Sequence, residues 1–371
     1  MSLAELLAIA SYDTLRSGWL ARYHAAAVPA AGRIAVVGAA GWIAPLVQAA
    51  AARGVEIGGI FDESPAREGA SLAGHVIRPL AAMQALDRAT PIALGTHHYG
   101  PLATRLRVQG FQHCLPYALF HEADPQWPAH PFYAGLLADL WAHRDRYAAL
   151  AQVLADDASR ATLDAVLAFR MTLEPERLAG CCRPDAYFAE LTSGGERDVF
   201  IDGGAYTGDT FARFGAWSGH RYRAALLFEP DPDNFAQLQV ATQGDARVRC
   251  VSSALAARAG EAQFVRDAGR TAHLAAHGGT PVRTVALDDS PAAADATLIK
   301  LNIEGAELEA LQGAAALIRR QRPQLAIAVY HRPAHLWQLM EYLQSLGVGY
   351  RFLLRQHAEA LVETVLYAAA Q

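Results

Sequence analysis

The chain has 371 residues, which is long enough for two α/β domains. It is 52% hydrophobic and 19% charged, a composition that excludes a disordered protein. Its formal net charge of -5 at pH 7 argues against a dedicated nucleic-acid-binding protein, which would usually carry a basic face. Apolar stretches such as residues 44–52 are too short to span a bilayer, the N-terminus lacks a signal-peptide pattern and the 4 cysteines form no CxxC pair, so we expect a cytoplasmic protein without a membrane span.

The first third of the chain is predicted to contain a small Rossmann-like α/β domain. Residues 1–29 form a helical lead-in, and the domain itself extends over residues 30–125. Strands at 33–38 and 55–61 flank a helical run at 43–53, which is a βαβ unit. A further strand, an amphipathic helix and a short strand are predicted at 91–95, 99–109 and 113–115.

This first domain carries a truncated glycine fingerprint. The turn from Gly38 to Gly41, followed by Asp62, resembles a short nucleotide-binding turn, and residues 74–95 resemble the N-terminal domains of bacterial sugar acyltransferases, which hold nucleotide-sugars. Two interpretations stay open: the domain binds a nucleotide-sugar or glycan and presents it, or it is a scaffold for a homodimer. His97 and His98 would line the crevice as substrate-binding residues. No carboxylate has matching spacing, so we predict no metal there.

Residues 126–184 are predicted to form a helical linker with two or three helices, and residues 185–371 a second α/β domain. Its strands alternate with helices, which predicts a parallel sheet covered on both faces. Two closing strands form a hairpin, so one of them runs antiparallel. The predicted strands lie at 199–202, 224–229, 248–254, 298–303, 325–331, 350–354 and 364–368, and the helices follow Gly208 and lie at 233–242, 307–320 and 334–346.

A glycine-rich turn after the first strand of this domain carries the strongest chemical signature. The strand ends in an acid, and the turn leads into a helix whose free N–H groups favour an anion. The spacing D-x-G-x-x-x-G differs from the dinucleotide pattern G-x-G-x-x-G and favours a ligand such as a methionine moiety over a pyrophosphate. An ordinary tight strand-to-helix connection is the alternative. The predicted binding residues are Asp202, Gly203, Gly204, Ala205, Tyr206, Gly208, Asp209 and Thr210.

The second strand of the domain also ends in an acid, Glu229, which lies 27 residues after Asp202. An acid at this place accepts hydrogen bonds from ribose hydroxyls, and ligands in open α/β sheets bind beyond the carboxyl ends of the strands. We therefore expect Glu229, with Pro230 and Asp231 beside it, to face the same crevice as the glycine turn. Two helix-capping acids are the simpler alternative.

With these residues in place, the sequence resembles the FkbM family of S-adenosylmethionine-dependent methyltransferases over about residues 185–368. The matching motifs are IDGGAYTGDTF, FEPDPDNF, SSALAARAGEAQF, VRTVALDD, LIKLNIEGAELEALQGA and AVYHRPAHLWQLMEYLQSL. The resemblance implies a class I methyltransferase fold, a doubly wound seven-stranded sheet with an antiparallel last strand, and methyl transfer to a hydroxyl. It also implies that residues 202–210 hold the methionine part of the cofactor, that Glu229 holds the ribose, and that Ser253, Ala254 and Leu255 lie near the adenine.

The fourth strand of the domain alternates polar and apolar residues, so we expect Lys300, Asn302 and Glu304 to point to one face. Lys300 is the single lysine of the chain, which indicates that a compact ammonium is needed there. A buried ion pair that serves only the fold is the alternative. The family usually has aspartate at the position of Asn302, and this departure puts in doubt any role of residue 302 as base or metal ligand.

A histidine at the end of the fifth strand is the predicted general base. His331 titrates near neutrality and would accept the proton of a hydroxyl, with Glu304 orienting it; a merely packed histidine is the alternative. Arg332 and His335 follow in a loop that would contact the acceptor, and Arg270 lies in a segment where the family often has a loop over the cofactor. Glu304 and Asp231 could ligate a divalent metal, but no complete ligand set is visible.

The sequence therefore predicts an O-methyltransferase that uses S-adenosylmethionine and acts on a sugar, a nucleotide-sugar, a glycan or a related natural product. An NAD(P)-dependent oxidoreductase is an alternative that the spacing of Gly204 and Gly208 disfavours. A catalytically inactive nucleotide-sugar-binding protein is the other alternative, and Asn302 is its one supporting feature.

Overall fold

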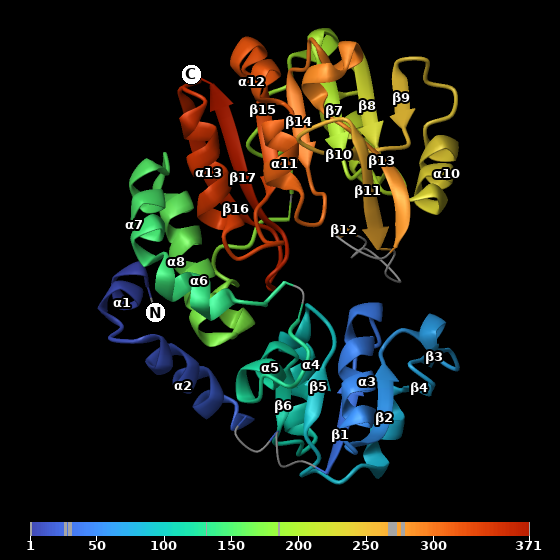
Figure 1. The fold of residues 1–371 in the computed structure, drawn as a ribbon, viewed down its shortest axis with the longest axis vertical. Helices are drawn as coiled ribbons and strands as arrows, with labels where there is room; N and C mark the ends of the chain where they lie inside the picture. Colours follow the sequence, from blue (N-terminus) through green and yellow to red (C-terminus); the bar gives the residue numbers. More distant parts are fainter. Residues whose placement is uncertain are drawn as a thin grey trace.

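The computed structural model describes residues 2–25, 28, 32–130, 132–184, 186–265, 273–275 and 279–370. It consists of two α/β units joined by a helical segment (Figure 1). The lead-in helices α1 and α2 pack beside that segment, and their serine N-caps, Ser2 and Ser11, accept hydrogen bonds from the first-turn N–H groups. The bounds of these helices are Leu3–Ala8 and Tyr12–Arg22.

The N-terminal unit is a six-stranded sheet in the order β3-β4-β2-β1-β5-β6. Its strands β1, β2, β4, β5 and β6 are parallel, and the short β3 pairs antiparallel with β4. The strands are β1 (Arg33–Val37), β2 (Glu56–Asp62), β3 (Ser71–Leu72), β4 (His75–Pro79), β5 (Ile92–Leu94) and β6 (Cys114–Pro116), and the helices are α3 (Ala44–Ala52), α4 (Tyr99–Val108) and α5 (Ala118–Ala123).

Three helices connect the two units: α6 (Leu136–Ala142), α7 (Arg144–Val153) and α8 (Asp157–Thr172). This helical segment covers the outer strand of the second sheet, β16 (Tyr350–Gln356). The buried Arg355 of β16 forms ion pairs with Asp156 at 2.8 Å and with Glu190 at 2.5 Å. The polar edge of the sheet is therefore paired with the helical segment and not left open to another chain.

The second unit is a seven-stranded sheet in the order β16-β17-β15-β14-β7-β8-β9, with β17 antiparallel to both neighbours. The central strands β7 and β14 are fully buried, because helices cover both faces. The remaining elements are β7 (Val199–Gly203), α9 (Asp209–Ser218), β8 (Ala224–Phe228), α10 (Pro232–Ala241), β9 (Val248–Val251), β14 (Leu298–Leu301), α11 (Glu307–Gln312), α12 (Ala315–Gln321), β15 (Gln324–Ala328), α13 (His335–Ser345) and β17 (Thr364–Ala370).

The predicted mixed α/β architecture is confirmed, but four elements differ from the sequence-based expectation. Strand β14 ends at Leu301 and β15 at Ala328, so the polar residues that follow them lie in turns. The helix predicted at 307–320 is broken at Gly313, where a Cβ would lie 2.1 Å from the carbonyl oxygen of Ala256. A four-stranded sheet that we did not predict follows β9; it consists of β10 (Ala254–Leu255), β11 (Gly260–Val265), β12 (His273–Ala275) and β13 (Thr280–Val285).

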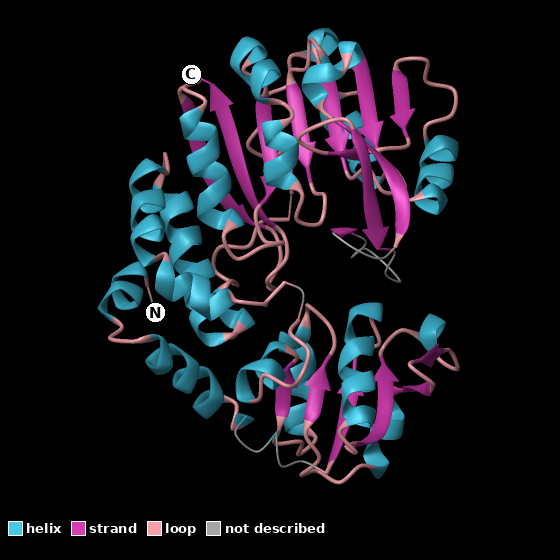
Figure 2. Cartoon of the chain, in the orientation of Figure 1, coloured by secondary structure: helices cyan, strands magenta, loops and turns pink. Residues whose placement is uncertain are grey.

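The two large sheets present their carboxyl edges to each other. In Figure 2 the arrowheads of β2 and β5 point toward the second unit, and those of β7 and β8 point toward the first. Contacts between aromatic rings join the two edges, because the ring centroid of Phe132 lies 5.6 Å from that of His331 and 6.4 Å from that of Tyr330.

Candidate functional site

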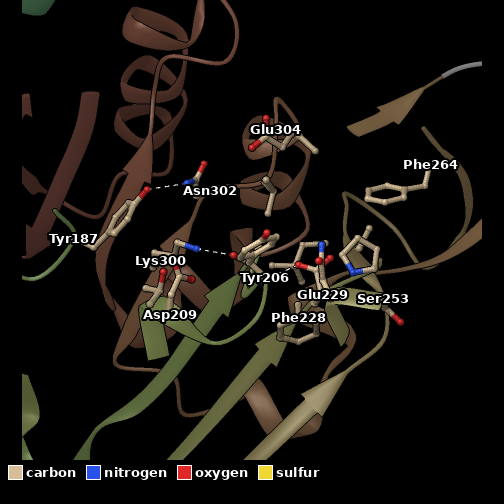
Figure 3. A pocket seen from close by; sticks show the side chains of 18 of the residues that line it. Tyr187, Tyr206, Asp209, Phe228, Glu229, Ser253, Phe264, Lys300, Asn302 and Glu304 are labelled. Carbon is tan, nitrogen blue, oxygen red and sulfur yellow. Dashed lines mark hydrogen bonds between the residues drawn. The ribbon is translucent and has the colours of Figure 1, made fainter. Parts of the chain in front are cut away.

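A cavity opens at the carboxyl ends of β7, β8 and β14, with an empty volume of about 1010 Å³ including its mouth. Figure 3 shows Tyr187 and Asn302 on one side of this cavity and Phe264 on the other. Its mixture of aromatic, apolar and carboxylate groups is typical of a small-molecule site. The predicted residues that line it are Gly204, Tyr206, Asp209, Thr210, Glu229, Pro230, Ser253, Ala254, Lys300, Asn302 and Glu304.

The glycine turn after β7 is shaped by close backbone contacts. Gly204 has a φ of 77°, and a Cβ there would lie 2.0 Å from the carbonyl oxygen of Asn302. A side chain is excluded by this contact and disfavoured by the left-handed conformation. The backbone N–H groups of Gly204 and Ala205 both donate to the carbonyl of Phe228 at 3.0 Å. The turn therefore holds β7 and β8 together at the floor of the cavity.

Glu229 is the buried acid of the cavity. Its two carboxylate oxygens accept hydrogen bonds from the backbone N–H groups of Tyr206 and Asp231, each at 2.9 Å. Burial raises the pKa of Glu229 to about 7, although these two hydrogen bonds act in the opposite direction. A carboxylate oxygen can accept more than one hydrogen bond, so Glu229 keeps capacity for hydroxyl donors of a ligand.

Lys300 and Asp202 form a fully buried ion pair with an Nζ–Oδ1 distance of 2.8 Å. The ammonium also donates to the carbonyls of Gly203 at 3.2 Å and Gly204 at 2.9 Å, so its three donors meet three acceptors. Burial raises the pKa of Asp202 above its ordinary value, and Lys300 opposes this effect. Asp202 does not line the cavity; its role in the structure is that of a counter-ion that fixes the glycine turn.

The residues after β14 form a turn, because the strand ends at Leu301. The side-chain amide of Asn302 donates to the hydroxyl of Tyr187 at 2.8 Å and accepts from the hydroxyl of Tyr330 at 3.2 Å. Glu304 has a φ of 54°, which is uncommon for a residue with a side chain. The cavity is lined by all three polar residues of this segment, Lys300, Asn302 and Glu304. Only Lys300 belongs to the strand, and the other two lie in the turn that follows it.

His331 belongs to a buried cluster of charged groups. Its Nδ1 lies 2.8 Å from Glu307 and its Nε2 lies 3.5 Å from Glu304, while His335 contacts the other oxygen of Glu307 at 3.1 Å. Burial alone would lower the pKa of His331, but the two carboxylates outweigh it and raise this pKa to about 10. The histidine is therefore protonated at neutral pH, which argues against its predicted role as a general base.

Glu307 holds this cluster together. Its Oε1 accepts from the backbone N–H of Ile303 at 2.9 Å, so the carboxylate fixes both the histidines and the turn that carries Glu304. The contacts with His331 and His335 lower the pKa of Glu307 well below its ordinary value despite its burial. Sequence reasoning missed this residue, although it lies in the motif IEGAELEAL, three residues beyond Glu304.

The charge cluster predicts a particular dependence of stability on pH. The raised pKa of His331 stabilises the fold fully below the pKa of the unfolded histidine, and this stabilisation is lost as the pH rises toward about 10. We expect the thermal midpoint to fall between pH 7 and pH 10 in the wild type and much less in Glu307→Gln. Calorimetric melting curves measure this. The control is Glu341→Gln, whose carboxylate pairs with Arg146 at the surface, and an equal alkaline slope in both variants would contradict the assignment.

Several predicted residues lie away from the cavity. Asp231 caps α10, where it accepts from the N–H groups of Asp233 and Asn234, and His335 is buried in the charge cluster. Arg332 is exposed on the loop that precedes α13, and Arg270 lies outside the described residues. Gly203, Ala205 and Gly208 belong to the frame of the glycine turn, and His97 and His98 lie in the N-terminal unit.

The cavity also has walls that the sequence did not indicate. Phe264 comes from the unpredicted four-stranded sheet, and Tyr187 lies fourteen residues before Ile201, the first residue of the motif IDGGAYTGDTF. Neither position carries a local pattern that points to a ligand, because both come to the cavity through tertiary packing. The other lining residues that were not predicted are Arg213, Phe228, Asn234, Ile303, Ala306 and Glu363, whereas Leu255 belongs to the segment predicted near the adenine.

Within the described ranges, no group of three or more histidine, cysteine, aspartate or glutamate residues is arranged to hold a metal ion. In the same part of the chain, no helix has the length and apolar character needed to cross a membrane.

Comparison with known proteins gives one matching family model and a solved structure with a similar fold. Residues 202–352 match the family model of the methyltransferase FkbM domain. The crystal structure of a methyltransferase FkbM from Methylobacillus flagellatus has a TM-score of 0.72 and 24% identity, and the match covers 96% of this chain and 100% of that chain. This likeness extends over both units and supports the predicted class I methyltransferase fold. No curated protein sequence matches the chain.

Two further structures match at lower similarity. Fibrillarin from Aeropyrum pernix, solved with natively bound S-adenosyl-L-methionine, has a TM-score of 0.28 and 10% identity over 49% of this chain and 70% of that chain. An rRNA methylase from Streptococcus thermophilus has a TM-score of 0.30 and 10% identity over 48% of this chain and 89% of that chain.

Proposed function

We propose that the chain transfers a methyl group from S-adenosylmethionine to a hydroxyl of a sugar, a glycan or a related natural product, because residues 202–352 match the family model of the methyltransferase FkbM domain. The cofactor binds in the cavity beyond β7, β8 and β14. The proposal keeps the predicted division into a Rossmann-like domain at 30–125 and a methyltransferase domain at 185–371. The single observation that carries it is the convergence of the glycine turn, Glu229 and an apolar wall on one cavity.

The residues of the cavity fit the parts of this cofactor. The beginning of α9, which follows the glycine turn, offers backbone N–H groups to the methionine carboxylate. Glu229 accepts hydrogen bonds from the ribose hydroxyls. Leu255 and Phe264 provide an apolar surface suited to the adenine ring, beside Ser253 and Ala254.

The bound cofactor supplies an electrophilic methyl group on a sulfonium sulfur. The acceptor oxygen forms a bond to the methyl carbon as the carbon–sulfur bond breaks, and the hydroxyl proton must pass to a base. We assign the role of this base to Glu304, which lines the cavity. Among the described residues, its Oε2 has no hydrogen-bond partner and lies 3.5 Å from Nε2 of His331. His331 and Glu307 position this carboxylate, so the predicted roles of His331 and Glu304 are exchanged.

The two alternative functions are disfavoured by separate observations. An NAD(P)-dependent oxidoreductase would need a pyrophosphate-binding turn, and neither glycine turn has the spacing G-x-G-x-x-G. An inactive binding protein was suggested by Asn302, but Glu304 provides the cavity with a carboxylate in the following turn.

Calorimetry with S-adenosylhomocysteine tests the cofactor assignment. We expect binding that tightens about tenfold between pH 6 and pH 8, because the carboxylate form of Glu229, with a pKa of about 7, is the hydrogen-bond acceptor. In Glu229→Gln the binding should be weaker and independent of pH over this range. Glu309→Gln, which changes a carboxylate outside the cavity, is the control. Binding of NADH without binding of S-adenosylhomocysteine would overturn the proposed function.

A further inference from the structure

A cluster of aromatic and histidine side chains lies at the carboxyl edge of the N-terminal sheet. We call it the edge cluster and define it as Trp42, His97, Tyr117, His130 and Phe132. The ring of Trp42 lies 5.0 Å from that of His97, 4.5 Å from that of His130 and 5.9 Å from that of Tyr117, which it stacks on at an interplanar angle of 4°. His97 also stacks on Phe132 with centroids 5.4 Å apart.

The edge cluster occupies the place where this sheet is built to bind a ligand. The chain leaves β1 toward β2 on one side, and β5 lies on the other side, so the two strands enclose a topological switch point. Gly38 and Gly95 bring the two loops into contact, since a Cβ on Gly95 would lie 2.2 Å from the carbonyl oxygen of Gly38. Trp42 lies four residues after Gly38, and His97 lies two residues after Gly95.

Three polar groups of the edge cluster are buried and have no hydrogen-bond partner among the described residues: His97 Nδ1, Tyr117 Oη and His130 Nε2. The backbone N–H of Phe132 donates to His130 Nδ1 at 3.1 Å. Neutral His130 therefore carries its proton on Nε2, where the N–H lacks an acceptor. Buried polar groups without a partner are rare and costly, which indicates that a ligand supplies what they lack.

The chemistry of the cluster points to an uncharged, hydroxyl-bearing ligand. Burial lowers the pKa of His97 to about 4 and lowers the pKa of His130 well below its ordinary value. Both rings are therefore neutral at pH 7. Neutral N–H and O–H groups pair with hydroxyls, and aromatic faces pack against the C–H face of a sugar ring. His97 is only partly buried, whereas the rings of Trp42, Tyr117, His130 and Phe132 are buried.

The edge cluster is close to the proposed base. Phe132 contacts the ring of His331, and Nε2 of His331 lies 3.5 Å from the carboxylate of Glu304. Phe132 also lies beside Tyr330, whose hydroxyl donates to Asn302 in the wall of the cavity. Two ring contacts therefore connect the edge cluster with the residues that line the methyl-donor cavity.

We propose that the edge cluster is the acceptor subsite, which binds an uncharged carbohydrate ring and presents one of its hydroxyls to Glu304 and the methyl-donor cavity. This inference rests on the proposed function and assigns the N-terminal unit a direct part in it. The unit is then a substrate-binding domain and not only a scaffold.

Saturation-transfer NMR tests this subsite with four defined probes: the methyl glycosides of glucose, mannose, fucose and N-acetylglucosamine. Each is added to the full chain with S-adenosylhomocysteine, and the aromatic protons of the protein are irradiated. We expect transfer to at least one glycoside with the wild type, and a loss of about fivefold or more in Tyr117→Phe and in His130→Phe. Tyr350→Phe, which removes a hydroxyl that donates to Pro323 far from the cluster, should retain the signal.

The outcomes of these experiments test the carbohydrate subsite and the proposed methyl transfer separately. The absence of transfer from all four glycosides with the wild type, or its persistence in both cluster variants, would overturn the subsite. Calorimetry with S-adenosylhomocysteine should give the same affinity in all variants and shows that they are folded. If a glycoside binds in a Tyr117-dependent manner while S-adenosylhomocysteine does not bind, the subsite stands and the proposed methyl transfer fails.

Discussion

Replacing Lys300 by methionine is expected to lower the free energy of unfolding of the methyltransferase domain by about 3–5 kcal/mol. The substitution leaves Asp202 as a buried carboxylate without a counter-ion and removes the donor for the carbonyls of Gly203 and Gly204. For a domain of this size the loss corresponds to a fall in the thermal midpoint of roughly 6 °C or more. Scanning calorimetry measures it, and the relevant transition is the one that S-adenosylhomocysteine raises in the wild type.

A double variant separates loss of the ion pair from loss of packing. Lys300→Met combined with Asp202→Leu removes both charges, and we expect it to recover a large part of the lost stability, since buried pairs replaced by apolar residues are often neutral in their effect. Lys300→Arg should also destabilise the domain, because a planar guanidinium does not match three acceptors that converge on one atom. Equal midpoints for the wild type and Lys300→Met would contradict this account of the glycine turn.

Replacing Glu304 by glutamine is expected to lower kcat by about 10²–10⁴-fold, the usual contribution of a general base. The affinity for S-adenosylhomocysteine should change by less than about threefold, because Glu229 and the glycine turn hold the cofactor. The measurement is the release of S-adenosylhomocysteine from S-adenosylmethionine in the presence of a hydroxyl-rich cell extract, compared with calorimetry of the same samples. Glu309→Gln is again the matched control, since it lies in the next helix and does not line the cavity.

The variants of His331 distinguish a positioning residue from a base. In His331→Asn, Glu304 remains, so we expect a smaller fall in kcat than in Glu304→Gln, together with a shift in the pH profile. If His331→Asn lost all turnover and Glu304→Gln retained it, the original interpretation of His331 as the base would be restored. The high pKa that Glu307 and Glu304 give to His331 is the physical reason for our expectation.

The two ends of the cofactor cavity differ in how well the sequence predicted them. The glycine turn and Glu229 follow directly after buried strands, and the carboxyl ends of adjacent parallel strands meet at one edge. Local pattern therefore placed Gly204, Tyr206 and Glu229 correctly on the cavity wall. Phe264 and Tyr187 come from an added sheet and from a loop before β7, and no local periodicity links either of them to the site.

The alternation of polar and apolar residues from Lys300 to Glu304 predicts a continuous strand that points its polar side chains to one face. The polar residues do line the cavity, but a turn and not a strand brings the last of them there. Strand β14 ends at Leu301, and the carboxylate of Glu307 accepts from the N–H of Ile303, which folds the chain into a turn. Periodicity cannot report such a hydrogen bond, because it depends on a helix that begins three residues after Glu304. The same carboxylate sets the protonation of His331, which was predicted from the ordinary pKa of a free histidine.

The sequence by itself determined the α/β architecture, the glycine turn, the acid at the end of β8 and the resemblance to one methyltransferase family. These features are local: each depends on hydrophobic runs, glycine spacing or a residue at a strand end. Only the tertiary structure decided that Asp202 pairs with Lys300, that two carboxylates raise the pKa of His331 and that Phe132 of the edge cluster contacts His331. Charge states and contacts between domains depend on burial and on partners that are distant in the sequence, and a linear pattern contains neither.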